Sequence, residues 1–262
     1  MSSKPDYHLI GLYTRYSSWT ARVEAVLEYF QIPYTSEFIT LDKAPTISPS
    51  ARVPILTTST PLNLTITDSL SIAEFLADQN PHLHLWPRDA KLRALARSAA
   101  AEMHSGFGTL RNTFHTNFVA RYTGEIPVTA DARKEIRRVL AIWDSSRRVT
   151  RERLLEIDHD DHDDVDEGFL FGRFSIADAF FWPVLWRFRT YNLPLDEASP
   201  EALKWMETMW NNPAMKRLVH GFYRQAERPE TRIEQYENIF QGDGVQCEMF
   251  SEDWEFTAAA LR

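Results

Sequence analysis

The sequence predicts an α/β unit followed by an all-α unit. Over about the first 80 residues, hydrophobicity alternates between a period of two, typical of strands, and a period of about 3.6, typical of helices. From Leu92 onward, apolar residues recur at every third or fourth position, and strand-like alternation ends. The chain has 262 residues, 44% of them hydrophobic, so it can bury a substantial core in one or two domains.

The α/β unit is expected to begin with a strand at 7–13, where apolar positions alternate, and a helix at 18–31. Segment 34–41 alternates again and completes a βαβ unit. Segments 53–58 and 62–66 then predict a hairpin, and 67–81 predicts a helix that stops at Asn80-Pro81. This order, βαβ and then ββα, is that of a thioredoxin-like domain, to which we assign residues 1–81.

The second unit, residues 88–227, is expected to be entirely helical. The apolar stripe from Leu92 to Phe118 predicts one helix of about 30 residues. A second helix is expected at about 129–155, and its many basic residues indicate a solvated face. Ser175 and Asp178 have the spacing of a capping box, which predicts the start of a buried helix and makes Asp178 structural rather than catalytic. Helices at about 199–210 and 213–227 complete the unit.

Residues 156–167, EIDHDDHDDVDE, hold eight carboxylates and two histidines, too little apolar area to order themselves. We interpret them as an exposed loop. A metal site formed by His159, Asp160, His162 and Asp163 is the alternative, but the spacing matches no known ligand pattern. We therefore predict no metal.

The last 35 residues, 228–262, contain the aromatic residues Phe240, Phe250, Trp254 and Phe256. Such a tail is too aromatic for a free disordered arm. It is expected to fold back over the helical unit, and one path for it crosses the cleft between the two units. A tail that binds a partner through exposed aromatic residues is the alternative.

Composition excludes several classes of function. The net charge of -8 favours neither nucleic acid nor an anionic membrane surface as a partner. A single cysteine, Cys247, excludes a disulfide framework and a paired-cysteine redox site. No segment has the pattern of a secretory signal or a membrane span. We therefore expect a cytosolic protein.

Two adjacent hydroxyls, Ser17 and Ser18, lie where the first strand meets the first helix. Either could cap that helix, which is the commoner role of such a serine. A hydroxyl at a helix N-terminus can also donate to an anion, because that end carries partial positive charge. The residues alone leave open whether one of them is a catalyst.

Five stretches, in this order, resemble those of the soluble glutathione transferases. They are YSSWTARV (16–23), ARVPIL (51–56), TDSLSIAEFL (67–76), LWPRDAKLRALARSAAAEMHSGFGTLR (85–111) and FGRFSIADAFFWPVLWRFRTY (171–191). The resemblance covers about residues 7–227, and the last two stretches look like a serine-type, zeta-related branch found in bacteria and fungi. It implies glutathione as co-substrate, a small electrophile as the second substrate, a role in detoxification or secondary metabolism, and a homodimer.

The resemblance also implies the residues that activate the thiol. In the family, the residue at the start of the first helix contacts the glutathione sulfur. Aligning the segment ARV places Ser17 at this position, with Ser18 as the reserve. A free thiol titrates near 8.5, so only roughly 3% is thiolate at pH 7. A hydroxyl donor at a helix N-terminus would stabilise that anion.

Three further positions match the family's glutathione contacts. Pro54 resembles the family's cis-proline, which leaves the backbone of Val53 free to pair with the cysteinyl part of glutathione. Ser69 is suited to bind the γ-glutamyl carboxylate through its N–H and hydroxyl, and Asp68 to pair with the γ-glutamyl ammonium. Many relatives have Glu in place of Asp68. A simple capping role for Asp68 and Ser69 is the alternative.

The second substrate is expected between the two units. On a continuous helix, His104 and Arg111 would share one face beside the core stripe, and both are candidates for the substrate pocket. Tyr13, Arg15 and Trp19 lie closer in sequence to the sulfur-contacting serine and are expected to shape the same pocket.

Three functions remain open. The first is conjugation of glutathione to a small electrophile, without a metal and without a covalent enzyme intermediate. The second is a glutathione-dependent cis-trans isomerase of the maleylacetoacetate isomerase type, although those enzymes carry Ser-Ser-Cys where this chain has Trp19 after the serines. The third is a non-catalytic binder of glutathione or an apolar ligand.

Overall fold

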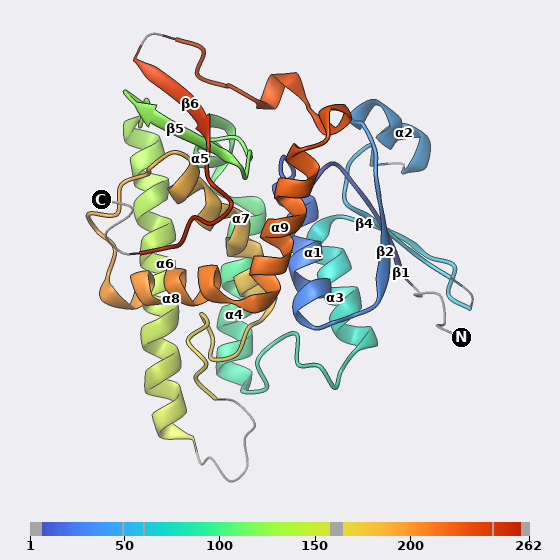
Figure 1. Cartoon of the computed structure of the whole chain (residues 1–262). Helices are drawn as coiled ribbons and strands as arrows, with labels where there is room; N and C mark the ends of the chain where they lie inside the picture. The colour runs from blue at the N-terminus through green and yellow to red at the C-terminus, as the bar shows by residue number, and fades with distance from the viewer. Residues whose placement is uncertain (1–6, 49, 60, 158–164, 243, 258–262) are drawn as a thin grey trace.

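The N-terminal unit is a four-stranded mixed sheet with its main helices on one side (Figure 1). This computed structural model describes residues 7–48, 50–59, 61–157, 165–242 and 244–257. Strand β1 (Tyr7–Gly11) runs parallel to β2 (Tyr34–Phe38) and antiparallel to β3 (Ile55–Thr58), which pairs with β4 (Thr65–Thr67). The sheet order is β2-β1-β3-β4, and the predicted thioredoxin-like arrangement is confirmed.

Helices α1 (Ser18–Tyr29) and α3 (Ser69–Gln79) lie between this sheet and the rest of the molecule (Figure 1). Short helices η1 (Leu41–Lys43) and α2 (Ala44–Ile47) follow β2, and Ala44 packs with Ile10 and Ile55. The end of β1 approaches α1 closely: a Cβ on Gly11 would lie 2.4 Å from the Thr20 methyl carbon. Glycine at this position therefore allows α1 to begin directly above the strand.

The second unit is built around α7 (Ile176–Thr190), in which every residue is buried. Helices α4 (Ala90–Ser105) and α1 both pack against α7, so α7 joins the two units. Around it lie α5 (Gly108–Thr113), α6 (Ala130–Glu156), α8 (Pro200–Asn211) and α9 (Pro213–Ala226). The predicted helical domain is thus confirmed. Among the described residues, no helix is both long enough and apolar enough to cross a membrane.

The prediction of one long helix from Leu92 is wrong. Helix α4 ends at Ser105, Phe107 takes a left-handed backbone with φ of 57°, and the short α5 begins at Gly108. The sequence misled because the loop residues Phe107, Phe114 and Phe118 are as buried as helical ones, so the apolar spacing continues through the break. Within α4, Leu95 is 39% exposed and does not belong to the core stripe.

The predicted capping box at the start of α7 is confirmed. The Ser175 N–H donates to Asp178 Oδ2 at 2.9 Å, and the Ser175 side chain caps the helix. The Leu170 N–H and Trp205 Nε1 donate to Asp178 Oδ1, at 2.9 and 2.8 Å. This buried carboxylate therefore connects α7, α8 and the loop before α7, which is a structural role.

The prediction that the second unit is all-helical misses a small sheet. Strand β5 (Ala120–Gly124) pairs antiparallel with β6 (Val245–Met249), which comes from the C-terminal tail. The tail leaves α9 through η2 (Pro229–Thr231) and η3 (Glu234–Tyr236) and crosses the top of the molecule to β6 (Figure 1). Trp254 then packs on Trp210 of α8, with ring centroids 5.0 Å apart. The tail thus lies on the helical unit.

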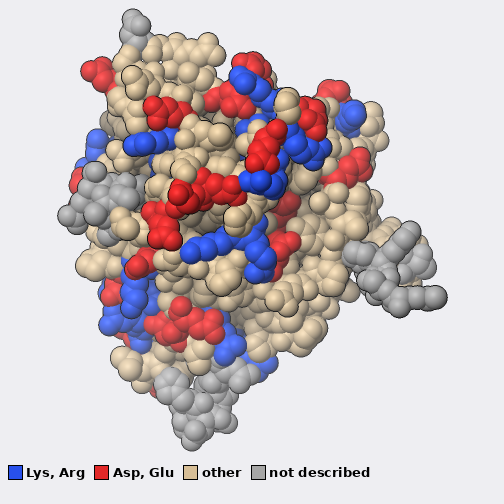
Figure 2. All heavy atoms as spheres, in the orientation of Figure 1, with Lys and Arg blue, Asp and Glu red and all other residues tan. Residues whose placement is uncertain are grey.

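Acidic and basic side chains are interspersed on the face shown in Figure 2. Ion pairs also form between α9 and the tail and within the tail, such as Arg224 with Glu252 at 2.6 Å and Arg232 with Glu234 at 2.8 Å. This face therefore lacks the extended basic patch that nucleic acid requires.

Candidate active site

Ser17 is the N-cap of α1. Its side-chain oxygen accepts a hydrogen bond from the Thr20 N–H at 3.2 Å, and it lies 2.9 Å from the Thr20 hydroxyl. Ser17 is 5% exposed and Thr20 is fully buried. The capping role considered for this serine is therefore present in the structure.

Ser18 is the first residue of α1, and its hydroxyl has no hydrogen-bond partner among the described residues. The N–H groups of Ser18 and Trp19 likewise have no acceptor there, as expected for the first turn of a helix. The first turn holds no acidic side chain. The positive end of the helix is thus left for an anion from outside.

Val53 and Pro54 lie immediately before β3, which pairs with β1, the strand that precedes α1. The Val53-Pro54 peptide bond is cis, as predicted. Pro54 is buried, whereas Val53 is partly exposed. In the part of the chain that the structure describes, the Val53 N–H and carbonyl form no hydrogen bond, so both can pair with an extended peptide.

Asp68 is the N-cap of α3, with a φ of 79°. Its Oδ1 accepts from the Leu70 and Ser71 N–H groups at 2.9 and 3.2 Å. Its Oδ2 lies 3.1 Å from His104 Nε2. Asp68 therefore caps a helix and at the same time directs one carboxylate oxygen outward.

Ser69 follows Asp68 and is fully buried. Its hydroxyl has no hydrogen-bond partner among the described residues, and neither does the Nδ1 atom of His104. Such unpaired buried polar groups are uncommon, and a ligand is one of the features that can satisfy them.

Trp19 brings together residues that are far apart in sequence. His104 lies edge-on to its indole, with ring centroids 5.4 Å apart, and the Arg111 guanidinium lies 5.1 Å from the ring centroid. His104 and Arg111 belong to two different helices, so the reason given for grouping them, one continuous helix face, is wrong. Both nevertheless contact Trp19, and His104 also contacts Asp68.

Arg22 was not predicted as a site residue. Its guanidinium lies 4.5 Å from the Trp19 ring centroid, and two of its nitrogens, Nε and one Nη, have no hydrogen-bond partner in the described chain. The sequence does show a basic residue one turn after the serines. The spacing of apolar residues alone could not tell whether its side chain faces solvent or the site.

Positive charge dominates around Trp19. The pKa of Arg22 is lowered to about 9, mainly by burial and also by the guanidiniums of Arg111 and Arg187, while Asp68 acts in the opposite direction. Burial also lowers the pKa of His104 below its usual range, against the opposing effect of Asp68. His104 is therefore neutral at pH 7, and Arg22 and Arg111, the two arginines that lie against Trp19, outnumber the Asp68 carboxylate. This environment favours an anionic ligand.

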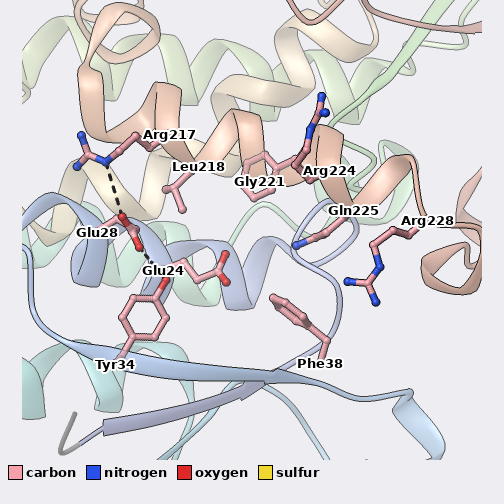
Figure 3. A pocket seen from close by; sticks show the side chains of 11 residues that line it. Glu24, Glu28, Tyr34, Phe38, Arg217, Leu218, Gly221, Arg224, Gln225 and Arg228 are labelled. Carbon is pink, nitrogen blue, oxygen red and sulfur yellow. Dashed lines mark hydrogen bonds and ion pairs between the residues drawn. The ribbon is translucent and has the colours of Figure 1, made fainter. Parts of the chain in front are cut away.

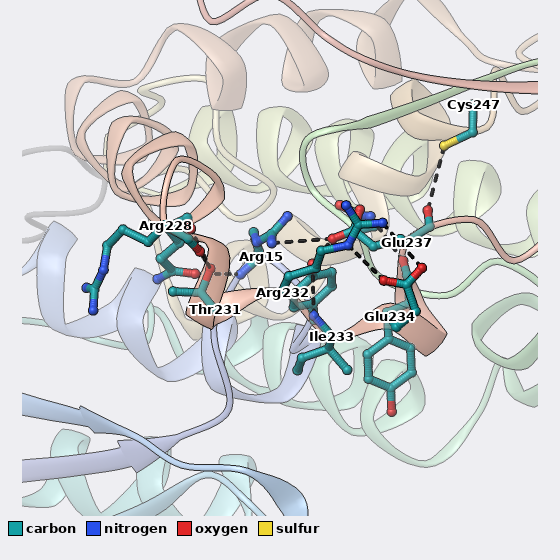
Figure 4. Close-up of polar contacts among 12 residues, drawn as sticks. Arg15, Arg228, Thr231, Arg232, Ile233, Glu234, Glu237 and Cys247 are labelled. Carbon is teal, nitrogen blue, oxygen red and sulfur yellow. Dashed lines mark hydrogen bonds and ion pairs between the residues drawn. The ribbon is translucent and has the colours of Figure 1, made fainter.

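The structure does not bring Tyr13 and Arg15 to this cluster. The Tyr13 ring packs on Phe38, with centroids 5.3 Å apart. Arg15 is buried and pairs with Glu237 of the C-terminal tail at 3.4 Å (Figure 4). Its backbone N–H donates to Gln225 Oε1 at 3.2 Å.

The tail also contacts the residue after Arg15. The Tyr16 hydroxyl donates to the Glu237 carboxylate, and the Ile233 N–H donates to the Tyr16 oxygen at 3.4 Å. The Tyr236 ring lies 5.9 Å from the Tyr16 ring. The turn that precedes the serines is thus held by the tail, an arrangement that no local sequence pattern could indicate.

Among the described residues, no group of three or more His, Cys, Asp or Glu side chains could hold a metal ion. His159, Asp160, His162 and Asp163, the alternative metal ligands, lie outside the described residues.

Comparison with known proteins agrees with this geometry. Residues 16–79 match the family described as glutathione S-transferase, N-terminal domain, and residues 126–208 match glutathione S-transferase, C-terminal domain. A pyrimidodiazepine synthase of Drosophila melanogaster is 36% identical over 95 residues. That match spans 34% of this chain and only 39% of the length of the relative.

Solved structures with the same fold include a glutathione transferase homologue from Burkholderia with bound glutathione, with a TM-score of 0.59 and 22% identity over 83% of this chain and 98% of that one. Ure2p in complex with S-p-nitrobenzylglutathione has a TM-score of 0.61 and 22% identity, over 84% and 97% of the two chains. The transferase URE2P6 of Phanerochaete chrysosporium, in complex with oxidized glutathione, has a TM-score of 0.59 and 19% identity, over 86% and 99%. From both domain matches and the shared fold, the chain belongs to the glutathione transferase superfamily.

Proposed function

We propose that the protein is an enzyme that activates the thiol of glutathione for conjugation to a small electrophile, and that Ser17 donates a hydrogen bond to the sulfur. The observation that supports this most directly is the position of Ser17 as the N-cap of α1, beside free N–H groups and with no acidic side chain in the first turn. An anion is favoured at such a helix end.

The capping and catalytic roles of Ser17 are compatible. A cap uses a lone pair of the side-chain oxygen, whereas donation to sulfur uses its proton. At 2.9 Å, the Thr20 hydroxyl can donate to Ser17 Oγ, which leaves the Ser17 proton for a ligand. In this arrangement Thr20 is a positioning residue. Ser18, whose hydroxyl lacks a partner among the described residues, is the alternative donor.

Four other residues would hold the rest of glutathione. Val53 would pair through its free backbone groups with the cysteinyl part, beside Pro54. Asp68 Oδ2, now in contact with His104, would receive the γ-glutamyl ammonium. Ser69, with an unpaired hydroxyl, would bind the γ-glutamyl carboxylate.

The second substrate would lie against Trp19 of the first unit and against His104 and Arg111 of the second, which both contact Trp19. Tyr13 flanks the same turn but packs on Phe38. Arg15 pairs with Glu237, so its proposed role becomes the attachment of the tail rather than a contact with substrate.

Two alternatives have specific support. An isomerase of the maleylacetoacetate type shares the two serines, and the tryptophan in third position weighs against it. A non-catalytic binder is supported by the fold shared with the nitrogen regulation fragment of the yeast prion protein Ure2p, with a TM-score of 0.59 and 22% identity. The serine-type, zeta-related assignment, the homodimer and the cytosolic location stay predictions from the sequence.

A panel of aryl halides, enones and isothiocyanates, each incubated with protein and glutathione, separates these functions by product mass. Conjugation gives a product heavier by glutathione, or by glutathione less the leaving group. Isomerisation gives an unchanged mass with altered chromatographic retention. Binding of glutathione without any product would contradict the enzymatic proposal and support the binder.

A further inference from the structure

A groove of about 350 Å³ lies between the N-terminal unit and α9, and it includes none of the predicted glutathione or substrate residues (Figure 3). One wall comes from α1 and β2, with Glu24, Glu28, Tyr34 and Phe38, and the other from α9 and the residues after it. Its volume is in the range of small-molecule sites.

The most buried charged residue that lines the groove is Glu24. It is 5% exposed, and its carboxyl forms no ion pair with any basic side chain among the described residues. The side chain extends into the groove, between Tyr34 and Gln225 (Figure 3). A buried carboxylate without a cationic partner is costly, and a bound cation would remove that cost.

The basic side chains of the groove already have acidic partners. Arg217 lies 3.9 Å from Glu28. Arg224 pairs with Glu252 at 2.6 Å, and Arg228 pairs with Glu230 at 2.8 Å. None of these guanidiniums pairs with Glu24, so none of them would compete with a bound cation for the Glu24 carboxylate.

The rest of the groove is apolar or uncharged. Phe38, Leu218 and Phe222 contribute hydrocarbon, and the Tyr34 hydroxyl is occupied by its bond to Glu28 Oε1 at 3.1 Å. On α9, a Cβ added at Gly221 would meet no atom within 4 Å, so this part of the wall opens onto space.

We propose that this groove binds a small amphipathic amine, with its ammonium group on the Glu24 carboxylate and its hydrocarbon part against Phe38 and Leu218. Charge complementarity indicates a cationic ligand, because Glu24 is the charged residue of the groove that has no oppositely charged partner among the described residues. The proposal is independent of glutathione chemistry.

The protonation of Glu24 supports the same assignment. Its pKa is raised to about 7, mainly by burial and also by the Glu28 carboxylate, while the Thr14 hydroxyl acts in the opposite direction. The other charged groups that face it, Arg217, Arg224 and Arg228, come from α9 and its C-terminal end. A bound ammonium lowers the pKa of a neighbouring carboxyl, so binding near pH 7 will release protons.

Three ligands of one shape test the proposal: 4-phenylbutylamine, 4-phenylbutanol and 4-phenylbutyrate, measured on the whole chain by calorimetry and ligand-observed NMR at pH 8. The amine is expected to bind at least tenfold more tightly than the alcohol, and the carboxylate most weakly. Calorimetry near pH 7 in two buffers of different ionisation enthalpy measures the released protons. Equal affinity for amine and alcohol, or tighter binding of the carboxylate, would overturn the proposal.

Two variants locate the site. Glu24→Gln is expected to reduce amine binding to the level of the alcohol and to leave the alcohol unchanged. Gly221→Leu fills the groove and is expected to abolish binding of both, whereas Gly221→Ala, its matched control, retains it. The Gly221 pair keeps the test valid if Glu24→Gln does not fold. Amine binding that survives both Glu24→Gln and Gly221→Leu would place the amine elsewhere and refute the site.

Discussion

Glu24→Gln should change how the free energy of unfolding depends on pH. Burial raises the pKa of Glu24 from 4.5 to about 7. Between these values the folded protein keeps a proton that the unfolded chain has lost, so the contribution of Glu24 to stability is fully present below about pH 4.5 and is lost as pH rises through about 7. At about 1.36 kcal/mol per pKa unit, the loss is about 3 kcal/mol. The glutamine side chain of the variant is neutral throughout, so the variant should not show this loss.

Urea unfolding of both proteins at five values between pH 4.5 and 8.5 measures this difference. The stability of the wild type relative to Glu24→Gln should fall by about 3 kcal/mol across the range, with most of the change below pH 7. Glu152→Gln, a substitution at an exposed position of α6, serves as the matched control and should follow the wild type. Parallel curves for the wild type and Glu24→Gln would refute the reasoning.

Three further predictions concern the core, the tail and the assembly. Asp178→Ala leaves four buried hydrogen-bond donors without their acceptor and should lower the free energy of unfolding, measured in urea, by about 3 kcal/mol or more. A decrease below about 1 kcal/mol would show that water replaces the carboxylate as acceptor. Glu237→Gln weakens the contacts of the tail to Arg15 and Tyr16. Backbone amides of 229–240 should then exchange hydrogen about fivefold faster than in the wild type. Unchanged exchange rates would show that other contacts hold the tail. Light scattering should give twice the 30.4 kDa chain mass if the protein is a homodimer, and 30.4 kDa at micromolar concentration would contradict it.

Local patterns predicted the parts of the fold that depend on local interactions. The spacing of Ser175 and Asp178 defined the start of α7 because both hydrogen bonds of a capping box form within one turn. The alternating periods of the first unit gave its strands and helices because each element buries one face. The break at Phe107 escaped detection because a buried loop keeps the same apolar spacing as a helix.

Contacts between distant residues could not be predicted in the same way. Strands β5 (ARYTG) and β6 (VQCEM) each alternate apolar and polar residues, but both are only five residues long and they are separated by more than 100 residues, so neither segment indicates its partner. Asp68, His104 and Trp19 were each proposed for the site, but their mutual contacts depend on how α3, α4 and α1 pack. Sequence could suggest Ser17 as cap or donor, whereas the hydrogen bond between the Ser17 and Thr20 hydroxyls became apparent only in three dimensions.

The titration of glutathione bound to the protein tests the central proposal most directly. Thiolate absorbance in the ultraviolet, recorded against pH for the wild type, Ser17→Ala and Ser18→Ala, gives the pKa of the bound thiol in each. If Ser17 is the donor, the wild type should hold this pKa well below 8.5, Ser17→Ala should raise it by about one to three units with glutathione still bound, and Ser18→Ala should leave it unchanged. A titration that is the same in all three proteins, or one altered only by Ser18→Ala, would contradict the assignment of Ser17.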